Sequence, residues 1–478
     1  MPVSIAIYRA LPFSGLRRRL RDLLKPLWAR PHAERVRLAI PGPLGSKDRA
    51  RAIYAGFFTL AGQKLETRGR PLFSIEPPSA AFGLKLHGFR WLADLEASGR
   101  MLDRVHGRAL VTDWLSRERQ HPRYARKRAC RAERLKSWIH AAPFLLDGAS
   151  LEFDTAFRAA ISREALRLQW PCLRPADRLA SACALVTAAA SMAGLESLEP
   201  ANSRRLARAL AREFPGGFPA SRNPLDLLRM LSELPPCAAT EPLARALSHL
   251  THADGGLARF HGMNHTGRDF APGPDGAQIA GGYARLAAGG QSVILDTEGF
   301  LGLELSSPAG RILTHCGWPL RARSQWQAAA NLAAAHSAPS LFDANPALSP
   351  GRAQCGSITE GHWVDASNGV FARGLLLAPD GRSLRGEDRL VGGRSGDVIL
   401  RFHLEPEAMP RLSDSQRSVM VSLGMEMWDF TASGARLALE DSLSIAGRET
   451  PVPSRQITLS LEAAAPGSTI SWAIRRVA

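Results

Sequence analysis

Hydrophobic positions in the first half of the chain recur with the period of an α-helix. Apolar residues stand at i, i+3 and i+4, which places them on one face of a helix. The segments with this pattern, separated by Gly, Pro or Ser, are residues 51–58, 91–95, 109–115, 138–146, 157–167, 177–193, 203–213, 224–234 and 241–251. Because no strict repeat period joins them, they predict an antiparallel helical array or toroid rather than a regular solenoid.

The pattern in the second half is shorter and alternates between apolar and polar positions, as in β-strands. The strand-like segments are residues 291–296, 302–306, 311–315, 369–377, 397–404, 436–440, 455–461 and 469–474. Turn residues such as Pro379-Asp380-Gly381 bound them. Short, regularly spaced strands that continue to the end of the chain predict a large antiparallel sandwich.

These two patterns predict an α+β multidomain protein, which agrees with a length of 478 residues. We expect a helical domain over residues 1–250 and a β-sandwich over residues 275–478. The junction, residues 251–274, is rich in Gly, His and Pro and favours neither period.

Charge separates the same two halves. Residues 1–250 hold 41 Lys and Arg against 22 Asp and Glu, whereas residues 251–478 hold 20 against 22. A field of positive sign attracts nucleic acid, an anionic membrane surface or an acidic polysaccharide. Arginine outnumbers lysine 55 to 6, as a GC-rich coding bias would produce, but such a bias does not explain the asymmetry between the halves.

Several classes of protein are disfavoured by the sequence. It has no run of about 18 uncharged apolar residues, so no ordinary transmembrane helix is expected. The start of the chain places its charges after a short apolar stretch, the reverse of a secretory signal, which predicts a cytoplasmic protein. Six cysteines without CxxC spacing predict neither a disulfide framework nor a zinc ribbon.

Two basic segments bear on possible partners. Residues 17–28 carry basic and apolar positions that could contact an anionic membrane surface, or could form a basic, solvated helix. Residues 117–136 are basic but have few aromatic residues and no recognisable binding motif, so nucleic acid is disfavoured as a partner.

Several short motifs, taken in order, resemble the heparinase II/III family of polysaccharide lyases. They are LHGFRWLADL at residues 86–95, residues 134–146, HADGGLARFHG at residues 252–262, residues 282–290, residues 335–337 and residues 401–404. Together they span residues 80–475, which is most of the chain.

The resemblance implies an N-terminal incomplete (α/α) toroid followed by a C-terminal antiparallel β-sandwich. It also implies β-elimination on an acidic, uronate-containing polysaccharide or oligosaccharide of the heparin, heparan or alginate type. In that reaction a base removes the proton next to the uronate carboxylate, positive or amide groups neutralise the carboxylate, and an acid protonates the leaving oxygen. The basic first half suits such a polyanion.

The family positions that carry this chemistry are altered here. The tyrosine of the family falls on Asp226, and residues 181–191 offer no counterpart of the family's Asn-His pair. The family's His-x-His motif falls on Leu295 and Thr297. The alternative is therefore a catalytically degenerate member that binds acidic polysaccharide without cleaving it.

Zinc is the one cofactor that the resemblance implies. The family's metal-binding aspartate becomes His315, and His336 remains from the third ligand motif. Zinc sites in proteins usually have four N, S or O ligands, or three with an open position, so this ligand set is incomplete.

The candidate residues fall into two groups. Catalytic candidates are His336, Asp226 and His265, and substrate-binding candidates are Arg222, Asn223, His252, Arg259, His261, Asn264 and Arg268. Each has a structural alternative. His336 could keep a hydrogen bond of the inherited fold, the junction residues could cap a polar loop, and Asn223 and Asp226 suit the N-cap and first turn of a helix that begins at Pro224.

Overall fold

The computed structural model describes residues 32–40, 42–43, 45–170, 174–264, 266–320, 325–342, 344–346, 349 and 351–477. His265 and the basic segment at residues 17–28 lie outside these residues. The chain forms two compact units. Unit 1 comprises Met1–Arg212 and Met230–Thr240, and unit 2 comprises Glu213–Arg229 and Glu241–Ala478.

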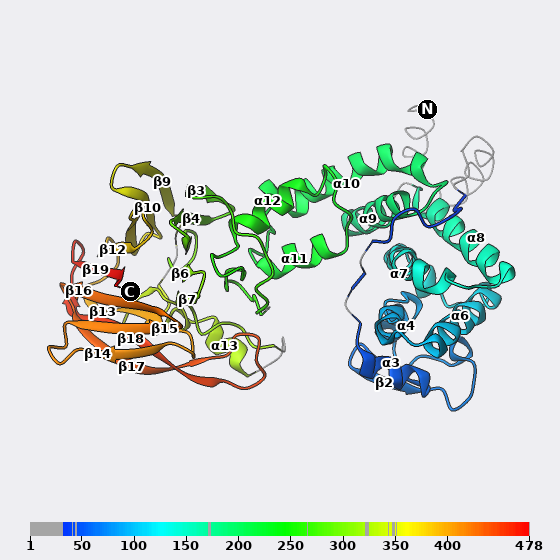
Figure 1. Ribbon diagram of the computed structural model, residues 1–478, viewed down its shortest axis with the longest axis horizontal. Coiled ribbons are helices and arrows are strands. Elements are labelled where there is room, and N and C mark those ends of the chain that lie inside the picture. Colours follow the sequence, from blue (N-terminus) through cyan, green and yellow to red (C-terminus); the bar gives the residue numbers. More distant parts are fainter. Residues whose placement is uncertain are drawn as a thin grey trace. The chain divides into compact units, whose positions relative to one another are not determined.

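Helices dominate the first half, as the hydrophobic period predicts (Figure 1). They are α3 (Lys47–Tyr54), α4 (Ala80–His87), α5 (Leu92–Ser98), α6 (Met101–Ser116), α7 (Arg128–Leu146), α8 (Leu151–Leu168), α9 (Pro175–Ser191), α10 (Glu199–Glu213), α11 (Pro224–Ser232) and α12 (Glu241–His249). Short 3₁₀ turns are η2 (Leu72–Ser74), η3 (Arg123–Arg126), η4 (Glu196–Leu198) and η5 (Pro215–Gly217).

Helix α7 is the centre of unit 1 and packs against α4, α5, α6, α8 and α9. It is buried on most of its circumference and carries a charged residue, Arg134, into the core. The Arg134 guanidinium donates to the carbonyl oxygens of His87 (3.0 Å) and Ala125 (3.2 Å) and forms an ion pair with Glu164. A buried charge with this many partners is compensated, so it fixes the packing around α7 instead of opposing it.

One prediction in this half is wrong. Residues 51–58 have a helical pattern, but α3 ends at Tyr54 and a hairpin of β1 (Phe57–Leu60) and β2 (Gln63–Glu66) follows. The break lies at Gly56, whose φ of 85° belongs to the left-handed region that favours glycine. The apolar pair at the end of the segment therefore belongs to a strand.

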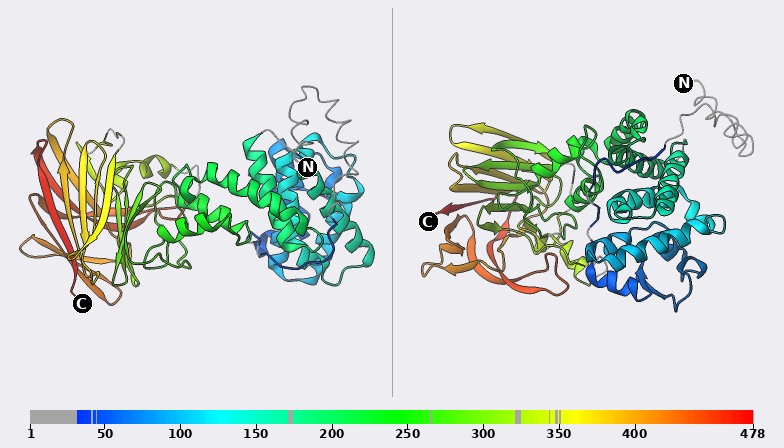
Figure 2. Two further views of the ribbon diagram at one scale, coloured as in Figure 1. Left: turned by 90° about the horizontal axis from the view of Figure 1, so that it is seen from above. Right: turned by 45° about the vertical axis from the view of Figure 1, so that its right-hand side comes forward.

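Unit 2 is an antiparallel β-sandwich, so the predicted fold class is confirmed (Figure 2). An eight-stranded sheet has the order β14 (Met409–Leu412), β15 (Ser418–Leu423), β16 (Glu426–Ser433), β19 (Thr469–Arg476), β12 (Ser383–Leu390), β11 (Phe371–Leu377), β10 (Gly361–Ser367) and β9 (Arg352–Ile358). A four-stranded sheet has the order β17 (Arg436–Ser444), β18 (Val452–Ala464), β13 (Gly396–His403) and β8 (Pro339–Leu341). A five-stranded sheet has the order β3 (Gly276–Ala280), β4 (Tyr283–Ala288), β5 (Gln291–Asp296), β6 (Leu303–Ser307) and β7 (Gly310–Leu313). Helix α13 (Trp326–Ala330) and turn η6 (Ala333–Ala335) lie in the connection from β7 to β8.

The three sheets share one hydrophobic core. The ring of Phe402 on β13 lies 5.0 Å from that of Phe430 and 4.9 Å from that of Trp472, which joins the four-stranded sheet to the eight-stranded sheet. Aromatic contacts at these distances add to the stabilisation from burial. The core therefore holds β5 and β6, which position the polar groups described below.

Two findings concern the classes of protein considered from the sequence. None of the described helices is both long and apolar enough to span a bilayer. The described cysteines, Cys130, Cys183, Cys237, Cys316 and Cys355, are all free thiols.

Candidate functional site

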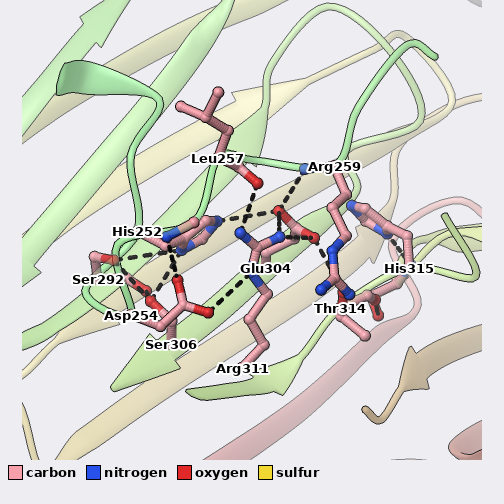
Figure 3. A network of polar contacts seen from close by, with 12 residues as sticks. His252, Asp254, Leu257, Arg259, Ser292, Glu304, Ser306, Arg311, Thr314 and His315 are labelled. Atoms are coloured by element: carbon pink, nitrogen blue, oxygen red, sulfur yellow. Dashed lines mark hydrogen bonds and ion pairs between the residues drawn. The ribbon is translucent and has the colours of Figure 1, made fainter. Parts of the chain in front are cut away.

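A closed network of charged side chains holds the junction segment against the sandwich (Figure 3). We define the closed network as His252, Asp254, Arg259, Glu304 and Arg311, with their hydroxyl partners. His252 lies in the junction, and its Nε2 is 3.0 Å from a Glu304 carboxylate oxygen while its Nδ1 is 3.0 Å from Ser306 Oγ. All three side chains are inaccessible to solvent.

Glu304 on β6 is the hub of this network. Its carboxylate accepts from Arg311 Nη1 at 3.0 Å, from the Arg259 backbone N–H at 2.9 Å and from Thr314 Oγ1 at 3.1 Å. Arg311 also lies 3.6 Å from Asp254. Burial alone would raise the pKa of Glu304, but Arg311 and the hydrogen bond from His252 together hold it well below its ordinary value. The carboxylate therefore stays ionised inside the unit.

The order Ser306, His252, Glu304 resembles the contacts of a hydrolase triad, but no substrate can reach it. A nucleophilic serine must meet a substrate carbonyl, and here Ser306 is fully buried. His252 and Arg259, two substrate-binding candidates from the sequence, lie in this buried network. Both ring nitrogens of His252 are used within the network, and Arg259 binds Glu304, Thr314 and Glu405. The contacts of both residues lie within the fold.

A second cluster in the same unit is partly open to solvent. We define the open cluster as Arg222, His261, Tyr283, Asp296 and Glu298. Asp296 ends β5, and its carboxylate accepts from Arg222 Nη2, from His261 Nε2 at 3.0 Å, and from the backbone N–H groups of Glu298 (3.1 Å) and Gly299 (3.0 Å). These donors hold the pKa of Asp296 far below its ordinary value despite burial.

The open cluster reaches solvent through Glu298, whose side chain is 61% exposed, and through His261 and Arg222. The His261 side chain is 32% exposed and that of Arg222 is 19% exposed, whereas that of Asp296 is 6% exposed. His261 and Arg222 adopt left-handed backbone conformations, with φ of 48° and 58°. Non-glycine residues in this region are strained and gather at functional sites.

Tyr283 forms the floor of the open cluster. Its hydroxyl donates to the Arg222 carbonyl oxygen at 2.6 Å, and the Arg222 guanidinium lies 4.8 Å from its ring centre. Burial raises the pKa of Tyr283 well above its ordinary value. The phenol is therefore neutral and positions Arg222.

His315 and His336 lie beside each other, with ring centres 4.8 Å apart. His315 Nδ1 accepts from the Ser337 backbone N–H at 2.9 Å, and His336 Nε2 lies 3.2 Å from the Ala330 carbonyl oxygen. Burial lowers the pKa of His336 to about 4 and holds that of His315 well below its ordinary value. Both imidazoles are neutral at pH 7.

The residues present do not fit a zinc ion. Within the described ranges, no group of three or more His, Cys, Asp and Glu side chains could hold a metal. The pair of His315 and His336 supplies two nitrogens, and a zinc site needs at least three protein ligands. These two histidines therefore do not form a zinc site.

The remaining candidates have local structural roles. Asn223 Oδ1 accepts from the Leu225 backbone N–H at 2.9 Å, and Asp226 accepts from Ser221 Oγ at 2.6 Å. Asn264 donates to the Leu320 carbonyl oxygen at 3.1 Å, and Arg268 lies 3.6 Å from Asp254. The contacts of Asn223 agree with capping of α11.

Sequence reasoning missed Asp296, Glu304 and Arg311. Asp296 ends the apolar run SVILD and Glu304 interrupts the strand GLELS. The available signal was a charged residue within an otherwise apolar strand. Such a residue needs charged or polar partners when the strand is buried.

Residues 272–473 match the family model for the heparinase II/III-like C-terminal domain. The second half of the chain is a heparinase II/III-family domain. The resemblance inferred from the motifs is thereby confirmed.

Solved structures agree with this heparinase II/III-like fold. Heparan sulfate lyase HepC from Pedobacter heparinus has 12% identity and a TM-score of 0.67, over 95% of this chain and 87% of HepC. Chondroitin AC lyase from Streptomyces coelicolor has 12% identity and a TM-score of 0.51, over 90% of this chain and 78% of the lyase. Identities this low establish the fold alone.

One curated protein has higher sequence identity. FtsZ-localized protein C from Caulobacter vibrioides is 26% identical over 494 residues, which cover 82% of this chain and 83% of that protein. The similarity therefore includes both units, whereas the family model covers only the sandwich.

Proposed function

We propose that this protein binds an acidic polysaccharide through its helical half and does not cleave it. The observation that carries the proposal is a basic surface at η3, which we define as Arg119, Arg123, Arg126 and Lys127. All four side chains are exposed, and none has a carboxylate partner among the described residues. Unpaired cations at one place attract a chain of carboxylates or sulfates.

The arrangement around η3 brings these cations together. Arg126 Nη2 donates to the Arg119 carbonyl oxygen at 2.8 Å, and Arg131 Nε donates to the Arg126 carbonyl oxygen at 2.9 Å. Turn η3 packs on α4 and α7, which belong to the core of unit 1. A rigid support lowers the entropic cost of holding several charges on one ligand.

The proposed lack of cleavage rests on unit 2. β-Elimination needs an accessible base and an accessible acid. His336 is half-buried, its pKa is lowered to about 4 and its Nε2 lies against the Ala330 carbonyl oxygen, while the Tyr283 hydroxyl is engaged with a backbone carbonyl. The Asp226 carboxylate accepts a hydrogen bond from Ser221.

The Caulobacter relative is named for its localisation with FtsZ and not for an enzymatic activity. This name supports a binding role and, we propose, a place in cell division.

Binding and cleavage are tested with the same polysaccharides. Heparan sulfate, alginate and hyaluronan are titrated by calorimetry, and unsaturated uronate ends are followed by ultraviolet absorbance. We expect binding that weakens as salt rises, with no absorbance gain. Arg123→Gln with Lys127→Gln should weaken binding about tenfold, while the control pair Arg411→Gln with Arg436→Gln on the sandwich should not. Equal loss in both pairs would contradict the assignment to η3.

The open cluster favours a second candidate, an eliminative lyase with His261 as its acid or base. Asp296 fixes one ring nitrogen of His261, which leaves Nδ1 to exchange a proton with a ligand. A rise in absorbance that disappears in His261→Ala but persists in His336→Ala would favour this candidate and exclude the binding-only proposal. Localisation of a fluorescent fusion relative to FtsZ tests the cellular part.

A further inference from the structure

A shallow groove crosses the outer face of the eight-stranded sheet, away from both clusters in sequence. Its volume is about 620 Å³, and it is lined by residues of β10, β11, β12, β16 and β19. Side chains of a strand alternate between the two faces, so the cross-strand register identifies those that face outward. The inward set includes Trp472 and Leu375, which belong to the core.

Two parallel rows of outward residues form the groove. One row runs Asp365, Gly374, Glu387, Ser471 and Ser433, and the other runs Trp363, Leu376, Arg385, Ala473 and Thr431. Each row crosses five strands, a span of about 19 Å at the usual strand spacing. The small side chains lie mainly on β19 and at Gly374, and they form the low part of the floor on either side of Arg385 and Glu387 of β12, so the groove can hold an extended ligand.

Trp363 lies flat at one end of this floor. A Cβ atom on its cross-strand neighbour Gly356 would come within 3.0 Å of Trp363 Nε1 and 3.2 Å of Cε2. The indole therefore covers the glycine directly. Since the covered face rests on the sheet and the side chain is half-buried, the opposite face is available as a platform.

Three charged side chains beside the platform have no partner in the described part of the chain. Asp365, Arg385 and Glu387 are exposed and make no hydrogen bond or ion pair there, although Asp365 and Glu387 flank the same glycine. Two carboxylates and one guanidinium give the groove acceptors and donors that are free for a ligand.

We propose that this groove binds a neutral saccharide chain. Trp363 stacks on the apolar face of one sugar ring, and Asp365, Glu387 and Arg385 exchange hydrogen bonds with hydroxyl groups of its neighbours. The excess of carboxylates disfavours an acidic saccharide by like-charge repulsion. An extended peptide would instead pair with a free strand edge, and the groove lies on the face of central strands.

This site is independent of the proposed function, which uses the cations of η3 in unit 1. The full-length protein is titrated by calorimetry with soluble chitin, cellulose and xylan oligosaccharides, and with heparan sulfate for comparison. We expect at least one neutral oligosaccharide to bind. Trp363→Ala should weaken that binding about tenfold or more, since a stacked aromatic is a typical binding hot spot.

Two further variants separate loss of the site from loss of folding. Glu387→Gln keeps the shape of the groove and should also weaken neutral-sugar binding, whereas Arg411→Ala on edge strand β14 should leave it unchanged. The proposal is overturned if no neutral oligosaccharide binds, or if Trp363→Ala binds as well as the parent chain. It is also overturned if heparan sulfate or an acidic peptide depends on Trp363 in the same way.

Discussion

The closed network and the open cluster use the same side-chain types in the same unit, and differ in how they are covered. In the closed network His252, Glu304 and Arg311 are all inaccessible. In the open cluster the carboxylate of Asp296 is buried while its hydrogen-bond partner His261 is 32% exposed. A histidine, a carboxylate and an arginine thus form a structural clamp in one place and a ligand-accessible group in the other.

The difference follows from where the partners come from in the chain. Glu304 and Arg311 stand on neighbouring buried strands, β6 and β7, so the core closes over both. Arg222 and His261 come from segments without strand pairing and hold left-handed conformations. Burial on all sides demands full pairing of charge, whereas a cluster at the end of a strand can keep one side free.

The largest effect is expected from breaking the closed network. Glu304→Gln removes the charge that compensates the buried Arg311, and should lower the free energy of unfolding by about 3–5 kcal/mol. Denaturation in urea, followed by tryptophan fluorescence, measures the loss.

Asp296→Asn is the matched variant in the open cluster. It should lose about 1–3 kcal/mol, because Arg222 is already near Glu298 and the surface. Equal losses in the two variants would show that the clusters are equally closed, against the accessibilities seen here.

An effect of comparable size, visible only as the pH falls, is expected from His336, which lies within the influence of both clusters. Its pKa is lowered to about 4, chiefly by burial, and Asp296 and Glu304 act on it in the opposite direction. In the unfolded chain the imidazole takes up a proton near its ordinary pKa of about 6.5, which the folded chain cannot do until about pH 4. Its contribution to the unfolding free energy therefore falls by about 3 kcal/mol as pH drops through that window.

His336→Gln should flatten this pH dependence. Unfolding midpoints between pH 7 and pH 4 are compared with those of the parent chain and of His362→Gln, whose ring lies near the surface with Ser357. If the pH dependence of the unfolding midpoint were unchanged in His336→Gln, the imidazole would titrate normally, and water would reach it more freely than its burial indicates.

The sequence predicted a helical first half and a β second half correctly, because each hydrophobic pattern continues over many segments. The helical spacing identified α8, α9, α11 and α12 to within a few residues at most ends, and alternation identified β5, β13 and β19. The hairpin at β1 and β2 was missed because one glycine ends a helix inside an apolar run. Strands such as β12 escaped because charged outward residues dominate their pattern.

The site could be predicted only in part. Arg222 and His261 were candidates because of their type and their place near the junction, and the structure brings them together on Asp296. His252 was a candidate for the same reasons, yet it is buried. The sequence does not show which junction residues the sandwich covers. Asp296 itself looked like the end of a strand, and its side-chain partners His261 and Arg222 are 35 and 74 positions away.

The smallest expected effect isolates the backbone of the open cluster. His261 holds a φ of 48°, which costs a non-glycine residue about 1 kcal/mol relative to glycine. His261→Ala keeps that cost and loses the hydrogen bond to Asp296, so it should destabilise by about 1 kcal/mol. His261→Gly loses the same bond but relieves the strain, so its unfolding free energy should stay near that of the parent chain. Urea unfolding of the two variants side by side measures the difference. If glycine were the more destabilising replacement, the left-handed conformation would not be strained, and its occurrence at both Arg222 and His261 would no longer mark the open cluster as functional.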